Sequence, residues 1–440
     1  MSSAGRVGAA GRSALIAGGG PGGLAAALCL SRTGWDVTVL ERGPGPDRTG
    51  AAIALQPNGL AVLDALGVAG RLVERGSGVP ALVVYTPSGD VLQEISPPPF
   101  LGHHAAVVVR RSVLADVLTE AIAARPNVEL RYDTAVLAAD RHGRVKVVPA
   151  GSVASSHDGT IDDDMFEDDT FEDDRSGGAT IDRIASGATS AGTGALEADL
   201  VVGADGVGSR VRRSGAFGPG PITSRYRYAR WIIEGVVGQQ PGECWSPGGL
   251  MGWADIGDGH SYWYASLGDP EVSAAVDEGD RDRFVRRWQT LVPFVADGIA
   301  LLPDLDRVLV NEAPRVRCRR WVDGRVALLG DAAHAMAPNL GQGANSAFVD
   351  AAVLALAVRE GPVTQGLDDY QRSRRRKVAR VQRSADLLAR VSHIEQPVVR
   401  RIRDRVVGAA AHPRLVAGQV RAAFQVDPAG LRSDLRAVLG

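Results

Sequence analysis

The segment Ser13–Glu41, SALIAGGGPGGLAAALCLSRTGWDVTVLE, decides the fold. Its apolar start, Ser13–Ala17, predicts a strand, and a loop rich in glycine follows at once. Gly22–Ser31 then predicts a helix, and Asp36–Leu40 predicts a second strand. A strand, a helix and a second strand within about thirty residues form the unit from which parallel α/β sheets are built. The sequence therefore predicts an α/β fold that starts close to the N-terminus.

The loop of this unit matches the pattern G-x-G-x-x-G at Gly18, Gly20 and Gly23, with Gly22 inside it. The glycines allow a tight turn and let a pyrophosphate approach the N-terminus of the helix. Glu41 closes the second strand, where a carboxylate can accept a hydrogen bond from a ribose hydroxyl. Because this acid would repel a 2′-phosphate, the unit favours FAD or NAD over NADP.

Two further segments combine an apolar run with a polar turn at its end. In Asp199–Arg212 (DLVVGADGVGSRVR) the run ends in Asp-Gly, and in Arg325–Asp350 (RVALLGDAAHAMAPNLGQGANSAFVD) it ends in Gly-Asp. Asp331 thus stands at the carboxyl end of a predicted strand, and a helical pattern begins near Gly343. Carboxylates accept hydrogen bonds from hydroxyls, and a helix N-terminus stabilises an anion. The segment predicts a site for a ligand with sugar hydroxyls and a centre that becomes negatively charged.

The composition limits the class of protein. The chain has 440 residues, too many for one ordinary core, so we expect two closely packed domains. Its net charge of −2 gives no argument for a nucleic-acid partner, and no run of 18 residues is apolar enough to predict a membrane span. The three cysteines have neither the spacing of a metal site nor that of a disulfide framework. We therefore expect no metal and a reducing, cytoplasmic location.

An acidic segment interrupts the α/β pattern. Ten of the 51 acidic residues lie between Asp158 and Asp174, in near-repeats flanked by glycine and serine. Such a composition cannot bury enough apolar surface to offset the cost of ordering, so residues 151–195 are predicted to be a flexible insertion. A carboxylate cluster can bind a divalent cation, but the spacing lacks the D-x-D-x-D-G pattern of a calcium loop.

The patterns also predict how the domains are arranged. Trp231–Val237, Leu250–Ile256 and Ser261–Leu267 are typical of strands, which predicts an antiparallel sheet. The predicted fold is a Rossmann-like cofactor domain interleaved with this sheet and followed by C-terminal helices. Its divisions are a disordered tail at 1–12, the cofactor domain at 13–80, 102–214 and 318–362, a substrate domain at 81–101 and 215–317, and a helical region at 363–440.

Three motifs together resemble a known family. They are the glycine loop with Glu41, the segment D-x-x-x-G-A-D-G-x-x-S-x-x-R, and the segment G-D-A-A-H-x-x-x-P-x-x-G-Q-G-x-N. In order and spacing they are similar to the single-component (group A) flavoprotein monooxygenases, the para-hydroxybenzoate hydroxylase-like family that includes salicylate and urate hydroxylases. The likeness spans about residues 13–385.

The resemblance implies that FAD is the cofactor and assigns residues to it. The glycine loop and Glu41 would hold the ADP half, and Arg111, which opens a predicted helix, would contact the phosphates or the ribityl chain. Asp205 and Gly206 match a segment implicated in binding both FAD and the pyridine nucleotide. The cofactor-binding residues implied in this way are Gly18, Gly20, Gly22, Gly23, Glu41, Arg111, Asp205, Gly206, Gly330, Asp331, Pro338, Gly341, Gly343, Ala344 and Asn345.

The third motif would lie at the reactive ring. The resemblance implies that Asp331 bonds ribityl or phosphate-proximal hydroxyls, and that Pro338 and the turn from Gly341 to Asn345 border the isoalloxazine. The helix that begins there would stabilise negative charge on the reduced ring.

The resemblance also implies the reaction. NADH or NADPH would bind transiently and reduce FAD, which would take up O2 as a C4a-hydroperoxide and transfer one oxygen to an electron-rich, usually aromatic, molecule. The protein would exclude water and orient that molecule. The implied partners are O2 and a small aromatic or polycyclic substrate, and the implied assembly is a monomer or a homodimer.

The substrate pocket is expected between the flavin and the antiparallel sheet, and no catalytic base can be assigned. Candidate lining residues are Arg230, Trp231, Trp245, Met251, Trp253, Tyr262 and Tyr264, although aromatic residues on a sheet are more often core. His103 and His104 could act on a phenol, but an ordinary loop histidine explains them equally well. Arg230, Tyr262 and Tyr264 are the other candidates for a catalytic role. His334, inside the third motif, is expected to make a structural hydrogen bond.

Other functions on the same fold stay open. An FAD epoxidase, a reductase or another oxidoreductase would carry the same cofactor motifs. A halogenase is disfavoured because the element W-x-W-x-I-P is absent. An FAD-binding regulatory protein is the non-enzymatic alternative, but none of the cofactor motifs is broken.

Overall fold

The computed structural model describes residues 11–48, 50–96, 106–152, 182–183, 194–223, 226–236, 238–410, 418 and 422–439. Most of the acidic insertion, residues 1–10 of the predicted tail, and His103 and His104 lie outside these ranges. The domain boundaries given above stay a prediction.

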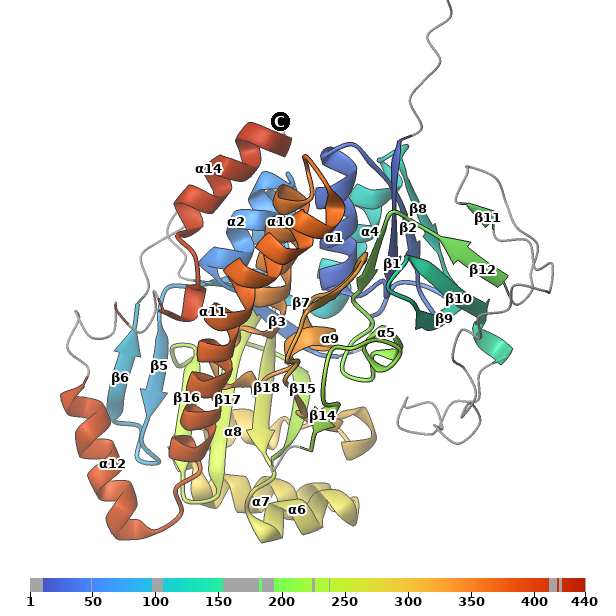
Figure 1. Ribbon diagram of the computed structural model, residues 1–440. Helices are drawn as coiled ribbons and strands as arrows, with labels where there is room; N and C mark the ends of the chain where they lie inside the picture. The colour runs from blue at the N-terminus through green and yellow to red at the C-terminus, as the bar shows by residue number, and fades with distance from the viewer. Residues whose placement is uncertain are drawn as a thin grey trace, which may run out of the picture.

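A six-stranded sheet forms the centre of the fold, in the order β21–β22–β13–β1–β2–β8 (Figure 1). Neighbouring strands are parallel except for β21 and β22. The strands are β1 (Arg12–Ala17), β2 (Trp35–Leu40), β8 (Val128–Arg131), β13 (Leu200–Gly203), β21 (Val322–Asp323) and β22 (Val326–Leu328). The predicted strand–helix–strand unit is confirmed as β1, α1 (Pro21–Arg32) and β2, within one residue at each end.

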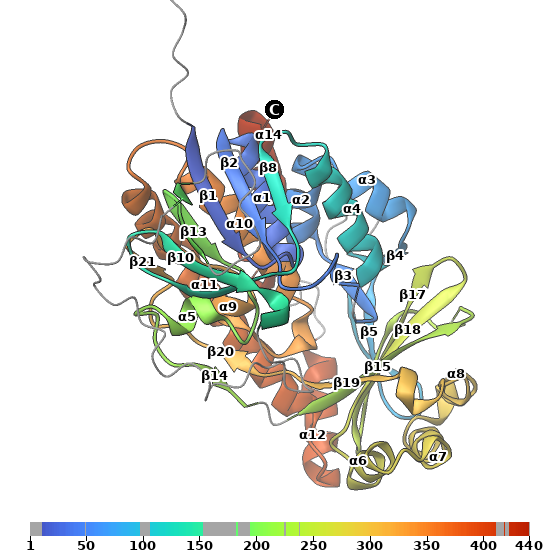
Figure 2. The ribbon, with the colours of Figure 1, turned by 90° about the vertical axis from the view of Figure 1, so that its right-hand side faces the viewer.

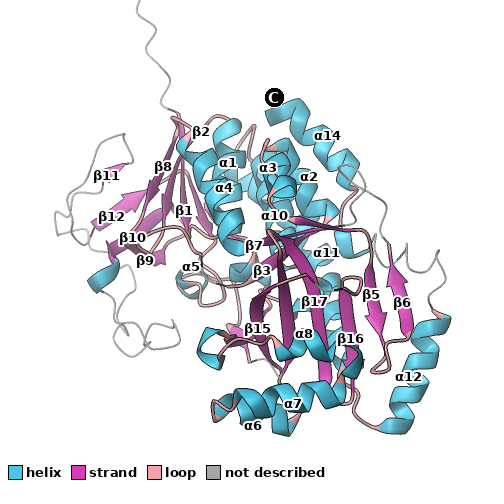
Figure 3. Ribbon diagram, turned by 180° about the vertical axis from the view of Figure 1, so that it is seen from behind, coloured by secondary structure: helices cyan, strands magenta, loops and turns pink. Residues whose placement is uncertain are grey.

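Helices and a smaller sheet cover the two faces of this central sheet (Figures 1 and 3). On one side α1 packs against α4 (Arg111–Ala123) and α10 (Gly343–Ala357), and its residues 23–31 are all buried. The layer is extended by α2 (Pro57–Ala65), α3 (Ala69–Glu74) and α14 (Pro428–Leu439). On the other side lies a four-stranded sheet, in the order β11 (Asp182–Arg183), β12 (Gly194–Glu197), β10 (Arg144–Pro149) and β9 (Thr134–Ala139).

The predicted second sheet is confirmed and has seven strands, in the order β19–β15–β18–β17–β16–β5–β6 (Figure 2). Its pairs are antiparallel except for β16 with β5. The strands are β5 (Leu82–Tyr85), β6 (Val91–Ile95), β15 (Arg227–Glu234), β16 (Gly242–Ser246), β17 (Gly249–Gly257), β18 (His260–Ser266) and β19 (Leu309–Glu312). Asp258 joins β17 to β18 with a positive φ of 52°, as its place between two glycines suggests.

One segment of this region is helical where the sequence patterns indicated only strands. The helices α6 (Pro270–Asp277), α7 (Arg281–Leu291) and α8 (Ala296–Ala300) follow β18. In α7 the side chains of Phe284, Val285, Trp288 and Leu291 are buried, at the spacing of one helix face. They pack on one face of the seven-stranded sheet and seal it from water.

Short elements and the C-terminal helices link the two sheets. The three-stranded sheet of β3 (Ala52–Leu55), β7 (Ala106–Arg110) and β4 (Ser77–Val79) contacts β17. β14 (Pro221–Ile222) pairs with β20 (Arg315–Val316), and the short helices α5 (Arg210–Arg213) and α9 (Asp331–His334) follow the ends of β13 and β22. The long α11 (Val363–Ser392) runs from the parallel layer down to the second sheet, where α12 (Pro397–Ala409) packs on β6 (Figure 1). In the part of the chain that the structure describes, no helix is both long and apolar enough to cross a membrane.

Candidate active site

The loops after three parallel strands meet at one edge of the central sheet. β1 pairs with β13, and β13 pairs with β22, so the turns that follow them lie side by side. These turns carry Gly18, Asp205 and Asp331, which come from the three sequence motifs. A cavity of about 2230 Å³ begins here and extends to the seven-stranded sheet. Pockets for one small molecule measure roughly 300–1,000 Å³, so this cavity has room for a dinucleotide and a second molecule.

The glycine loop is shaped for close backbone contact. A β-carbon at Gly23 would lie 2.0 Å from the carbonyl oxygen of Gly18, so only glycine fits there. Gly18 itself has a φ of +104°, which favours glycine. At Gly20, by contrast, a β-carbon would meet nothing within 4 Å, because this residue faces the open cavity. The loop therefore leaves space for a pyrophosphate in front of α1.

Glu41 is held by the backbone at the cavity wall. Its two carboxylate oxygens accept hydrogen bonds from the N–H groups of Gly19 and Gly43, at 2.6 and 2.8 Å. These bonds fix the carboxylate and leave lone pairs that a ribose diol can use. Gly22, in the same loop, packs against α10, where an added β-carbon would lie 3.1 Å from that of Ala347.

Only one of the two carboxylate oxygens of Asp205 has hydrogen-bond donors among the described residues. One oxygen accepts from the N–H groups of Arg210 and Val211, at 2.7 and 3.2 Å. The other is buried and has no hydrogen-bond partner among the described residues. Burial raises the pKa of Asp205, and the Ser209 side chain and backbone N–H groups oppose the shift only in part. The next residue, Gly206, has a φ of +77° and open space around it. A hydroxyl or N–H of a bound ligand would satisfy this site.

Asp331, at the start of α9, and Arg111, at the start of α4, line the same part of the cavity. Asp331 follows Gly330, whose φ is +57°, and its side chain is exposed only to the cavity, deep within the protein. This enclosure raises the pKa of Asp331, and His334 and Arg111 oppose the shift. The Arg111 guanidinium is half-exposed and lies 3.4 Å from Asp47. The pair offers a hydroxyl acceptor and a cation for a phosphate.

The N-terminus of α10 faces the cavity. Pro338, Gly341, Gly343 and Ala344 line it, and a β-carbon at Gly343 would meet nothing within 4 Å. Asn345 is fully buried behind them. Its amide donates to the carbonyls of Ala54 and Gly341, at 2.9 and 2.7 Å, and its oxygen accepts from the backbone of Gln56. The Asn345 side chain thus holds the wall in place, and the free backbone N–H groups at the start of α10 face the site.

A buried ionic network supports α10 from behind. Asp350 accepts from Arg374 at 2.7 Å and lies 2.5 Å from His334. Arg374 also donates to Gln425, whose amide donates to Ser346, both at 2.6 Å. Burial alone would raise the pKa of Asp350, but His334 and Arg374 outweigh it and lower the pKa. The expected structural role of His334 is consistent with this contact.

The seven-stranded sheet divides the sequence-predicted substrate residues between its two faces. Tyr262 and Tyr264 line the cavity from β18, with their ring centroids 5.6 Å apart, and Arg230 and Trp245 line it from β15 and β16. Side chains alternate along a strand, so their neighbours point the other way. Trp231, Met251 and Trp253 lie on the opposite face and are almost fully buried in the core that includes α7, although Trp253 also borders the cavity.

Arg230 and Tyr262 are close enough to interact electrostatically. The Arg230 guanidinium donates to the side-chain oxygen of Asn311 and lies over the ring of Tyr228. Burial raises the pKa of Tyr262, and Arg230 opposes this shift. A cation and a phenol therefore stand together at the cavity wall.

Glu243 is a candidate residue that the sequence patterns did not single out. It is 4% exposed, and the Trp245 indole N–H donates to one of its oxygens at 2.6 Å. The Tyr264 hydroxyl donates to the other at 3.1 Å. Burial raises the pKa of Glu243, and these two hydrogen bonds offset the shift only in part. Glu243 and Trp245 are two residues apart on one strand, which places them on the same face. The sequence patterns alone did not show which face of the strand meets the cavity.

The donor set fits FAD at both ends. The glycine loop and Glu41 suit the adenosine ribose and pyrophosphate, and the second oxygen of Asp205 finds no donor among the described residues, so a ligand can supply one. Asp331 suits a ribityl hydroxyl, and the N-terminus of α10 suits a ring edge that becomes negative. Whether each residue makes its implied contact stays a prediction.

Comparison with known proteins identifies the family. A model described as an FAD binding domain matches residues 12–161 and 167–385. Aurachin C monooxygenase/isomerase of Stigmatella aurantiaca is 32% identical, and the alignment covers 86% of this chain and 88% of that protein. A 2-heptyl-3-hydroxy-4(1H)-quinolone synthase of Mycobacteroides abscessus is 28% identical, with coverages of 83% and 87%.

A solved structure shares the fold. It is Klebsiella pneumoniae HpxO complexed with FAD and uric acid, which is 22% identical and superposes with a TM-score of 0.72 over 94% of this chain and 97% of that one. The chain therefore belongs to the FAD binding domain family and is an FAD-dependent monooxygenase that acts on an aromatic substrate.

Proposed function

We propose that this monooxygenase hydroxylates an aromatic heterocycle that bears an apolar chain, with NADH or NADPH as the reductant and O2 as the oxidant. One observation carries the proposal. Beyond the tyrosine pair, the cavity continues into an arm between the second sheet and the C-terminal helices, which we call the apolar arm. The residues that line it are Val84, Trp245, Leu250, Leu388, Val391 and Val407.

The names of the relatives support a chain-bearing ring. The Mycobacteroides protein is named for a quinolone with a heptyl group, whereas HpxO is complexed with uric acid, a small polar ring. A polar ring of that size has no group that would gain from six apolar side chains. A buried methylene contributes up to about 0.8 kcal/mol, so an alkyl or similar chain would gain affinity in the apolar arm.

The polar end of the cavity suits an ionisable ring substituent. Because the Tyr264 hydroxyl donates to Glu243, its oxygen is left to accept a hydrogen bond from an O–H or N–H of the substrate. Glu243 can then take up a proton through Tyr264, and the ring gains electron density where oxygen is transferred. Bound FAD supplies the redox chemistry, while the chain orients the ring and keeps water away.

A substrate comparison tests the proposal. The panel contains a 4-quinolone with an alkyl chain, the same quinolone without the chain, and uric acid. The chain-bearing ring should stimulate NADH or NADPH oxidation most and yield one oxygenated product per reductant. Each fully buried methylene should raise kcat/KM by up to about fourfold. An epoxide, or reductant oxidation without an oxygenated product for every member, would favour the alternative oxidoreductase functions.

A variant of the apolar arm separates chain recognition from general damage. Leu388→Trp should fill the arm, lower kcat/KM for the chain-bearing ring and leave the bare quinolone unchanged. The control is Leu301→Trp, at a side chain that is 57% exposed and does not line the cavity. Equal loss for both substrates in Leu388→Trp would contradict the assignment of the arm.

A further inference from the structure

Helix α12 turns apolar side chains outward. Val398, Ile402 and Val406 recur every four residues and are 67%, 54% and 61% exposed; we call them the outer stripe. The opposite side of the helix faces the protein with a charged residue. Arg403 is 5% exposed, donates to the carbonyl oxygen of Trp245 and lies over that indole ring. A surface helix usually buries its apolar side, whereas α12 exposes these three aliphatic side chains and buries an arginine.

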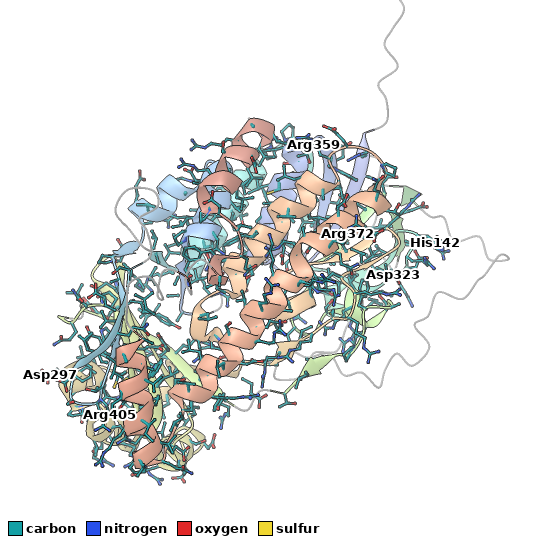
Figure 4. The ribbon with its side chains drawn as sticks, turned by 60° about the vertical axis from the view of Figure 1, so that its left-hand side comes forward. His142, Asp297, Asp323, Arg359, Arg372 and Arg405 are labelled. Atoms are coloured by element: carbon teal, nitrogen blue, oxygen red, sulfur yellow. The ribbon has the colours of Figure 1, made fainter. Side chains whose placement is uncertain are left out.

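Cations lie along one edge of the outer stripe. Arg401 and Arg405 are exposed and one turn apart, and neither forms an ion pair with the residues that the structure describes. The whole helix carries four arginines against one aspartate. Figure 4 places Arg405 at the end of the molecule far from Arg359. An apolar stripe with an arginine edge is the composition of helices that lie on anionic membrane surfaces.

The cavity opens beside the outer stripe. Val406 belongs to the stripe and also lines the cavity, as does the adjacent Val407 of the same helix. Leu387, on α11, lines the cavity as well and is 63% exposed. A molecule at the outer stripe is therefore at the entrance to the apolar arm.

We propose that α12 docks the enzyme on an anionic lipid bilayer, with the outer stripe in the acyl boundary and Arg401 and Arg405 on the headgroups. The cavity mouth then faces the layer in which a chain-bearing substrate accumulates. Docking is a property of the surface and does not depend on which ring the site oxidises.

A second copy of the chain fits this surface less well. In a two-fold dimer the same patch meets itself, which brings arginine edges of like charge together. Three aliphatic side chains also form a small contact, since a stable interface buries roughly 800 Å² on each partner. A bilayer with anionic headgroups complements both the stripe and its edge.

The test is co-sedimentation of the FAD-loaded protein with vesicles. With about 25 mol% phosphatidylglycerol in phosphatidylcholine, the protein should sediment, and with phosphatidylcholine alone it should bind roughly tenfold more weakly. High salt should weaken binding to the anionic vesicles. The variant V398S/I402S/V406S should bind the anionic vesicles at least about tenfold more weakly, because it no longer inserts aliphatic side chains into the bilayer. Its control, I222S/V236S/L301S, removes three exposed aliphatic side chains from other parts of the surface and should bind as the wild type does.

A charge variant and a mass measurement complete the test. R401Q/R405Q should weaken binding to anionic vesicles by about fivefold per arginine, and R359Q/R372Q should not. All variants should keep their FAD, since none of these residues lines the cofactor end of the cavity. Absence of sedimentation with anionic vesicles would overturn the proposal. So would a wild-type dimer that V398S/I402S/V406S converts to a monomer, because the outer stripe would then be a contact between copies.

Discussion

Arg374 donates a 2.7 Å hydrogen bond to Asp350 where both side chains are at most 1% exposed. The bond joins α11 to α10, and α10 is the helix whose N-terminus faces the expected flavin edge. His334, the last residue of α9, contacts the same carboxylate. The Asp350–Arg374 pair thus connects the C-terminal helices to the cofactor side of the cavity. Loss of the pair should therefore destabilise both.

Removing one partner of this pair should destabilise the protein. Asp350→Asn leaves Arg374 charged and buried without its carboxylate, which typically costs about 3–5 kcal/mol. Urea unfolding followed by flavin and tryptophan fluorescence measures the loss. The double variant D350L/R374M should be less destabilised than Asp350→Asn, because it leaves no uncompensated charge from this pair. A double variant that is worse than the single one would refute the argument.

Two glycines of one loop should respond in opposite ways to alanine. Gly23→Ala places a methyl group against the carbonyl of Gly18 and should lower the free energy of unfolding by roughly 1–3 kcal/mol. Gly20→Ala meets no protein atom, so the apoprotein should keep its stability within about 0.5 kcal/mol. FAD titration of Gly20→Ala should nevertheless show weaker binding, because its methyl group occupies the space expected for the pyrophosphate. Unchanged FAD affinity in Gly20→Ala would place the cofactor elsewhere.

The contrast between these glycines and Glu243 shows what the sequence could predict. The glycine loop, α1 and Glu41 are fixed by neighbours within thirty residues, so period and spacing reveal them. Glu243 gains its significance from Tyr264, 21 residues away on another strand, and from a face that only the packing of α7 defines. Arg374 is the same case, because its partner Asp350 lies on a different helix. Local patterns predict elements and motifs, and long-range packing decides which polar residues are buried.

Glu243 and Tyr264 should affect the oxidation of the substrate ring and not the binding of its apolar chain. Glu243→Gln cannot accept a proton and should lower kcat by about 10²- to 10⁴-fold for a substrate with an ionisable group. A carboxylate base is active only when ionised, so wild-type kcat should fall as pH drops through the raised pKa of Glu243. Stopped-flow turnover across pH should show this acidic limb in the wild type and its absence in Glu243→Gln.

Two further variants test the interpretation of that experiment. Glu234→Gln changes an exposed glutamate of the same sheet and should keep both rate and pH profile. Tyr264→Phe should reproduce the loss of Glu243→Gln while its KM for the chain-bearing ring changes little. If Glu243→Gln retains the acidic limb, another group is the base.

His393 should make the protein sensitive to mild acid. It stacks on Tyr226, its Nδ1 lies 2.7 Å from the carbonyl oxygen of Ala389, and burial lowers its pKa from 6.5 to about 4. The folded state therefore binds fewer protons than the unfolded state between pH 4 and 6.5, and stability falls as pH falls through that window. At pH 5 the free energy of unfolding should be about 2 kcal/mol lower than at pH 7 because of this group.

Thermal unfolding at pH 5 and pH 7 tests the role of His393. The difference between the two pH values should be smaller for His393→Gln than for the wild type. His142→Gln, which changes an exposed histidine (Figure 4), should leave the difference unaltered. Equal pH sensitivity in the His393 variant would assign the acid response to other groups.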